Sequence, residues 1–164
     1  MLKAGVLGAG HLGKIHLRLL QQSTYYILVG FYDANQQVAK TIEQTLGYKS
    51  FPTMESLIEA CDMIDVVTPT IQHFKCAEKV ITAGKHLFIE KPITHTVVEA
   101  DMIRDLAKKH GVRGQVGQVE RFNPAFMAVN NMIDKPMFIE AHRLAEFNPR
   151  GTDVSVVLDL MIHD

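Results

Sequence analysis

The chain has 164 residues, of which 47% are hydrophobic and 21% charged, and its formal net charge is −1 at pH 7. This length suits one domain, or one domain and part of a second, with enough apolar residues for a buried core. A nearly neutral chain shows no electrostatic footprint for nucleic acid or an anionic membrane, and no apolar run approaches the roughly 18 residues of a membrane span. Two cysteines outside any C-x-x-C motif favour a reducing, cytoplasmic compartment, and the scattered histidines predict no metal site.

Short β-type runs alternate with helical patterns through the first 120 residues. In chain order, we expect strand 3–8, helix 11–22, strand 26–33, helix 35–46, strand 48–51, helix 54–60, strand 63–70, helix 72–83, strand 86–90, helix 97–110 and strand 112–119. In the first helix, an apolar stripe at helical spacing includes Leu12, Ile15, His16, Leu19 and Leu20. This order predicts an α/β Rossmann fold, a doubly wound parallel sheet, over residues 1–120.

The pattern changes after residue 120. We expect a helix over 123–133 with Asn123 as its N-cap, a strand over 137–147, and a further apolar strand at 154–164. The last strand has no partner in the sequence, and natural proteins normally cover such an edge. Residues 121–164 are therefore interpreted as the start of a truncated α/β substrate domain, most of which is absent.

The first candidate site is "GAGHLG", which fits G-x-G-x-x-G with Gly8, Gly10 and Gly13. It follows a predicted strand and opens a predicted helix, with His11 and Leu12 at the helix N-terminus. The glycines would permit a tight turn, close approach of a pyrophosphate, and close helix–strand packing. The turn predicts a dinucleotide cofactor; a glycine-rich turn without a ligand is the alternative.

Asp33 ends the second predicted strand, 33 − 13 = 20 residues after the last glycine of the motif. A carboxylate here can accept hydrogen bonds from the ribose hydroxyls, and it would repel a 2′-phosphate. The next four residues include no Arg or Lys. NAD is therefore favoured over NADP, with a solvated turn aspartate as the alternative.

Further candidates follow the fourth and fifth predicted strands. Thr68 and Pro69 end one, and Glu90 and Lys91 end the other, just before Pro92. The carboxyl ends of parallel strands share one sheet edge, where ligands bind. A residue before proline has a restricted backbone, so Lys91 would be aimed by a stiff chain, with Glu90 holding its ammonium or a ribose hydroxyl.

For three further positions, two histidines and one aspartate, the sequence pattern alone allows both a functional and a structural role. His73 is either a cofactor contact or a surface helix histidine. Asp159 and His163 are four positions apart, so on a helix they share one face. A histidine can remove a hydroxyl proton while a carboxylate fixes its tautomer, but a solvated helix face gives the same spacing.

Taken in order, "GAGHLG", "DVVTPT" with His73, "GKHLFIEKP", "VERFNP" and "DLMIHD" resemble the Gfo/Idh/MocA oxidoreductase family. The resemblance covers essentially the whole chain and implies an NAD- or NADP-dependent oxidoreductase acting on a sugar or cyclitol carbinol. It further implies a C-terminal α/β domain that forms the substrate site and a homo-oligomer interface. No other partner class is expected.

By position, Lys91 resembles the active-site lysine of the family, with a Lys91–Pro92 bond that is often cis. Asp159 and His163 match the family's D-x-x-x-H pair. The resemblance implies that His163 removes the hydroxyl proton as hydride passes to the nicotinamide, while Lys91 polarises the oxygen and Asp159 orients its neighbours. Which of the three is the formal base stays open.

"VERFNPAF" and "DVSVVLDLMIHD" are more similar to the branch acting on UDP-N-acetylglucosamine. Arg121 and Asn123 would then face the sugar nucleotide, or Asn123 would only cap the next helix. Two alternatives remain: an inositol or other cyclitol dehydrogenase, and a non-catalytic NAD-binding sensor module.

Overall fold

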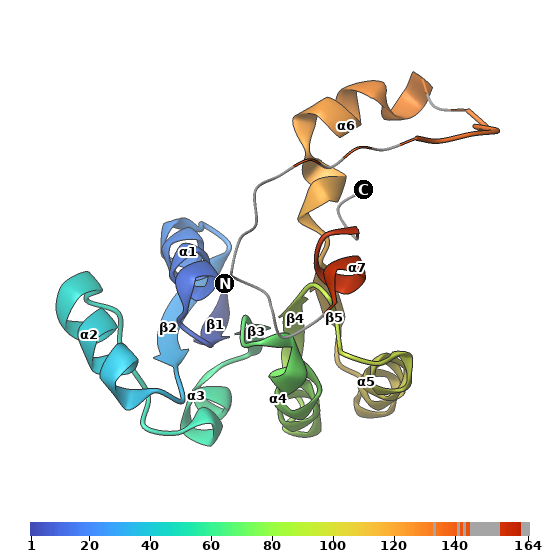
Figure 1. Ribbon diagram of the computed structural model, residues 1–164. Coiled ribbons are helices and arrows are strands. Elements are labelled where there is room, and N and C mark those ends of the chain that lie inside the picture. Colours follow the sequence, from blue (N-terminus) through green and yellow to red (C-terminus); the bar gives the residue numbers. More distant parts are fainter. Residues whose placement is uncertain (133, 141, 143, 145–154, 162–164) are drawn as a thin grey trace.

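The computed structural model describes residues 1–132, 134–140, 142, 144 and 155–161 (Figure 1). Five parallel strands form one sheet: β1 (Leu2–Leu7), β2 (Tyr26–Tyr32), β3 (Met63–Val66), β4 (His86–Glu90) and β5 (Gly114–Gly117). The helices are α1 (His11–Gln22), α2 (Gln36–Leu46), α3 (Met54–Ala60), α4 (Thr70–Thr82), α5 (Val97–His110), η1 (Val119–Phe122), α6 (Pro124–Val129), η2 (Asn130–Met132) and α7 (Val156–Asp159).

The strand order is β2-β1-β3-β4-β5. The chain moves outward from β1 to β2, then returns past β1 to build β3, β4 and β5 on the other side. The order therefore reverses between β1 and β3, where the crevice of a doubly wound sheet lies. The predicted Rossmann fold is confirmed.

Each face of the sheet has its own core. On one face, α1 and α2 pack over β1 and β2, around Val6, Leu17, Phe31 and Ile42. On the other face, α3, α4 and α5 cover the sheet in one row (Figure 1) and bury the second core, whose fully enclosed members include Leu57, Ile64, Val80, Ile81 and Ile89. Side chains alternate along each strand, so residues of β3 and β4 that point away from the second core face the α1 side.

Sequence signals fix where the helices begin and end. The Asn35 side chain accepts hydrogen bonds from the first turn of α2, and Gly47 ends that helix in the left-handed conformation. Thr96 and Glu99 form a capping box at the start of α5, and Gly111 ends it. The predicted bounds of α3 and α5 agree with the structure for this reason, and those of α1 agree as well, without a side-chain cap.

Three predicted strands are much shorter than expected, and the last of them, expected at 112–119, is β5 (Gly114–Gly117). The strand expected at 48–51 is only a bridge between Ser50 and Phe31 at the β2 edge. Pro52 follows at once and has no N–H with which to continue a ladder. The strand expected at 63–70 ends at Val66, because Pro69 is the N-cap of α4 and Thr70 is its first residue.

The segment after residue 120 differs most from the prediction. The expected helix divides into α6 and η2. The expected strand at 137–147 is wrong where the structure describes it, since residues 137–140 have no partner strand and the Phe138 side chain is 81% exposed. Part of the expected final strand is instead the short helix α7. Within the described residues, no helix is long and apolar enough to cross a membrane.

Candidate functional site

The turn between β1 and α1 lies at the carboxyl edge of the sheet, beside the end of β3. Gly8 has a φ of +91°, and its N–H donates to the Tyr32 carbonyl at the end of β2. A Cβ at Gly8 would approach the Val67 carbonyl oxygen to 2.8 Å, and a Cβ at Gly13 would overlap the Gly8 carbonyl oxygen. These two glycines are therefore required by the packing of the protein itself.

Gly10 is different, because a Cβ added there would meet no protein atom within 4 Å. Its φ of −64° is open to any residue, and the position is exposed. Among the described residues, no side chain caps α1, and its first turn carries no acidic residue. The free N–H groups and the positive end of the helix dipole thus face an open space, which suits a pyrophosphate. The exposed His11 and Leu12 flank this space.

Asp33 joins the turns that follow β1 and β2. Its Oδ2 accepts a hydrogen bond from the Ala9 N–H and its Oδ1 accepts one from the Asn35 N–H, both at 2.8 Å. Each oxygen keeps a further lone pair for a ligand hydroxyl. The negative charge stands at the end of β2, as the prediction requires, and no basic residue lies in the first turn of α2.

His73 is buried at 1% exposure, so it is not a surface histidine. Its Nε2 lies 2.8 Å from the Thr68 carbonyl oxygen, and its Nδ1 lies 2.9 Å from the Pro92 carbonyl oxygen. The ring therefore joins the segment after β3 to the segment after β4. Pro69, between Thr68 and α4, is exposed at the same edge.

The turn after β4 carries Glu90, Lys91 and Pro92. The Lys91–Pro92 bond is cis, as the family resemblance implies. The Glu90 Oε2 accepts a hydrogen bond from the Lys91 N–H at 3.1 Å. Its carboxylate thus contacts the backbone of the lysine. The pairing of Glu90 with the ammonium or with a ribose hydroxyl stays a prediction. Both residues are partly buried at the sheet edge predicted for them.

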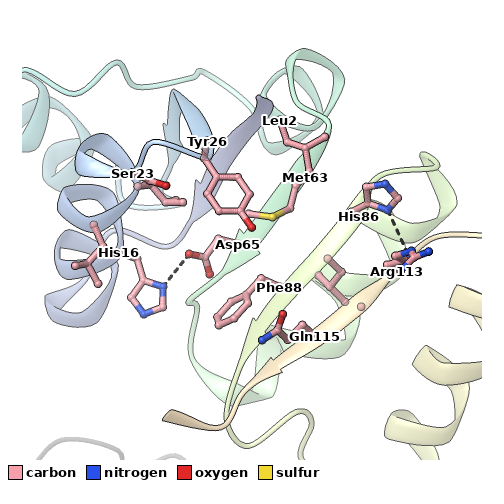
Figure 2. Close-up of a pocket in the computed structure, with 14 residues that line it drawn as sticks. Leu2, His16, Ser23, Tyr26, Met63, Asp65, His86, Phe88, Arg113 and Gln115 are labelled. Carbon is pink, nitrogen blue, oxygen red and sulfur yellow. Dashed lines mark hydrogen bonds and ion pairs between the residues drawn. The ribbon is translucent and has the colours of Figure 1, made fainter. Parts of the chain in front are cut away.

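Sequence reasoning missed a charged cluster beneath this turn. On the α1 side of the sheet, His16 Nδ1 lies 2.8 Å from Asp65 Oδ2 on β3 (Figure 2). The other ring nitrogen, Nε2, lies 3.4 Å from Glu90 Oε1. His16 sits on the apolar stripe of its helix and Asp65 sits in a buried strand. A titratable residue is unusual at a position expected to be buried, and this was the sequence signal that could have indicated the cluster.

Burial and the two carboxylates act in opposite directions on this cluster. Burial lowers the pKa of His16, but its interactions with Asp65 and Glu90 outweigh this and raise the pKa to about 9. Burial raises the pKa of Asp65, which is 4% exposed, and the hydrogen bond from His16 offsets this in part. Asp65 Oδ1 has no hydrogen-bond partner among the described residues.

The remaining predicted residues lie away from this edge or outside the described residues. The Asn123 Oδ1 accepts a hydrogen bond from the Ala125 N–H, so its capping role is confirmed. Arg121 is exposed and lines a cleft with His16 and Glu90. Asp159 is the last residue of α7, and its side chain lies outside the described part of the chain, as does His163 entirely.

Comparison with known proteins agrees with this geometry. The family model of the oxidoreductase family with an NAD-binding Rossmann fold, Gfo/Idh/MocA, matches residues 2–118. The chain belongs to the Gfo/Idh/MocA family. The matched range includes the glycine turn, Asp33 and the Glu90–Lys91 turn.

Several members of the Gfo/Idh/MocA family are similar over almost the whole chain. A UDP-N-acetylglucosamine 3-dehydrogenase from Acidithiobacillus ferrooxidans is 36% identical over 99% of this chain and 52% of its own length. Its solved structure superposes with a TM-score of 0.88 over 53% of that chain. An inositol 2-dehydrogenase from Rhizobium meliloti is 31% identical over 98% of this chain and 52% of its own length. The chain thus spans about half the length of these relatives.

Proposed function

We propose that the chain is the cofactor half of an NAD-dependent dehydrogenase that oxidises or reduces a carbinol of a sugar or nucleotide sugar. The observation that carries this proposal is the space at Gly10. Packing requires the glycines on either side of it, whereas the open space at Gly10 leaves room for a ligand at the α1 N-terminus.

The cofactor is proposed to be NAD rather than NADP. The Asp33 carboxylate, which the Ala9 and Asn35 N–H groups hold in place, would accept the ribose hydroxyls and repel a 2′-phosphate. When bound, the nicotinamide supplies hydride chemistry. Thr68 and Pro69 at the end of β3 and Lys91 at the end of β4 would border its nicotinamide half.

We assign the chemistry to Lys91 at the same edge, together with His163, Asp159 and Arg121. Lys91 would polarise the substrate oxygen. The backbone of its turn is held by two contacts, since Glu90 accepts the Lys91 N–H and His73 lies beside the Pro92 carbonyl oxygen. His163 would remove the hydroxyl proton, with Asp159 orienting its neighbours. Arg121 beside the Glu90 cleft is proposed to face the substrate.

The substrate proposed first is UDP-N-acetylglucosamine. Support comes from two relatives, 36% and 33% identical to this chain. One is the A. ferrooxidans enzyme, and the other is a glucose-6-phosphate 3-dehydrogenase from Bacillus subtilis, 33% identical over 81% of this chain. Both are named for position 3 of a glucose-type sugar. The inositol dehydrogenases among the relatives support cyclitols as the second candidate.

A second domain is proposed to begin near residue 121 and to mediate homo-oligomer formation. Support comes from exposed apolar side chains after this point: Phe122 is 68% exposed, Phe126 47% and Met132 79%. Surfaces of this kind are normally covered by another part of a protein or by another chain.

The test is NADH formation, followed by absorbance, with NAD and either UDP-N-acetylglucosamine or myo-inositol. In a protein that joins this chain to its substrate domain we expect turnover with the UDP-sugar, and a Lys91→Met variant of that protein should lose about 10²- to 10⁴-fold of the turnover while keeping its NADH affinity. Lys75→Met, which removes an exposed lysine of α4, is the matched control.

Two results would change the assignment. Turnover with myo-inositol alone would replace the sugar proposal with the cyclitol alternative. Tight NADH binding without turnover on either substrate would favour the non-catalytic NAD-binding module.

A further inference from the structure

A continuous line of contacts runs from the middle of β3 to the backbone of the proposed active-site lysine. Asp65 Oδ2 lies 2.8 Å from His16 Nδ1, and His16 Nε2 lies 3.4 Å from Glu90 Oε1. The other oxygen of Glu90 accepts the Lys91 N–H at 3.1 Å. Figure 2 shows the His16 ring reaching from α1 toward Asp65, next to Phe88 of β4.

We propose that His16 is a positioning residue for Lys91: as an imidazolium it bridges Asp65 and Glu90, and so fixes the carboxylate that holds the Lys91 backbone. This proposal rests on the proposed function of Lys91. His16 itself is not assigned any contact with cofactor or substrate.

The protonated form of His16 follows from what surrounds the ring. An ionised carboxylate only accepts hydrogen bonds, so when Asp65 and Glu90 are both ionised the ring between them carries a proton on each nitrogen. Because Asp65 Oδ1 has no partner among the described residues, the His16 N–H is the one donor that the structure gives to this buried carboxylate. The other titratable or charged groups that line the clefts beside the ring are Tyr26, His86, Arg113 and Arg121.

Glycine at position 117 makes room for this arrangement. Gly117 of β5 pairs in register with Glu90, and a Cβ there would lie 2.6 Å from Glu90 Oε1 and 2.9 Å from its Cδ. Such contacts require the carboxylate to move. Gly114, three residues earlier on the same strand, has no atom within 4 Å of an added Cβ. Neither position has a left-handed backbone.

These two glycines give a matched test that changes no charged residue. In Gly117→Ala, the Glu90 carboxylate should be displaced from His16 and from the Lys91 N–H, whereas Gly114→Ala should leave both contacts intact. The readout is NMR of the 164-residue chain, following the His16 ring nitrogens and the Lys91 amide proton between pH 6 and 10.

In the wild type, both His16 ring nitrogens should be protonated at neutral pH, and the Lys91 amide shift should follow the titration of the ring, with its midpoint near the His16 pKa of about 9. Gly117→Ala should lower that midpoint and move the Lys91 amide upfield. The proposal would be overturned if the chemical shift of the Lys91 amide did not change as His16 titrates. Identical spectra for the two alanine variants would also overturn it.

Turnover separates this inference from the proposed function. If the enzyme is active, Gly117→Ala should lower kcat roughly 10- to 100-fold while the KM for NAD stays the same, as expected for a misplaced catalytic group. Equal kcat values for Gly117→Ala and Gly114→Ala would count against positioning by His16. Absence of turnover in the wild type would contradict the proposed function. The NMR comparison would then still test whether His16 and Glu90 position the Lys91 backbone.

Discussion

The three glycines of the β1–α1 turn differ in what a side chain at each position would meet. At Gly8 and Gly13 an added Cβ would meet backbone atoms of Val67 and of Gly8, which cannot move without distorting the sheet. At Gly10 it would meet solvent, or a ligand. One motif therefore combines two glycines that the fold requires with a third whose open space suits the proposed ligand.

This difference predicts opposite outcomes for two alanine variants. Gly13→Ala should lower the free energy of unfolding by about 1–3 kcal/mol or more, because backbone must shift to admit the methyl group. Gly10→Ala should change it by less than about 1 kcal/mol, since the position has ordinary dihedral angles and open space. Urea denaturation measures both, and a destabilised Gly10→Ala would mean that the protein, not a ligand, requires this glycine.

The site residues that sequence analysis predicted belong to short local motifs. Gly8, Asp33 and Lys91 each stand where a strand ends, so the order of elements is enough to bring them to one edge. The His16–Asp65 contact joins residues 49 positions apart on faces that only the packed structure defines. Its residue types were visible in the sequence, but their pairing was not.

At the scale of elements, the same contacts tie α1 to β3 and β4, and this link depends on pH. The folded state raises the pKa of His16 from 6.5 to about 9, so folding favours the protonated ring. The resulting stabilisation is fully present below about pH 6.5 and is lost as the pH rises through about 9.

We expect His16→Gln to reduce stability most at pH 6 and least at pH 10. The shift corresponds to about 3 kcal/mol, but the ring keeps some contact with solvent, so the expected change in the mutational effect between these pH values is about 1–2 kcal/mol. Urea denaturation at both pH values measures this. The exposed His95→Gln serves as the control, and a His16→Gln effect that is the same at pH 6 and 10 would contradict the assignment.

The order and type of the elements up to β5 were predictable, because periodicity and caps such as Asn35 and Thr96 are local signals. The lengths of the strands could not be predicted, because a strand extends only as far as the neighbouring strand that pairs with it. Ser50 forms a bridge and no more beside β2, and residues 137–140 have strand-like composition but no partner. Apolar alternation alone does not distinguish these cases.

At the scale of the molecule, the sheet order places the β1 and β3 ends side by side, with β2 and β4 flanking them. The glycine turn, Asp33, Thr68 and the Glu90–Lys91 turn therefore share one edge (Figure 1). Such an edge is where doubly wound sheets bind nucleotides. We propose that this edge holds NAD.

A fluorescence titration of the chain with NADH and then NADPH tests that claim most directly. We predict saturable binding of NADH, at least about tenfold tighter than that of NADPH, because the Asp33 carboxylate would face a 2′-phosphate and the first turn of α2 carries no basic residue to offset the repulsion. Tighter binding of NADPH would contradict the role of Asp33. Binding of neither would contradict the assignment of this edge as a nucleotide site.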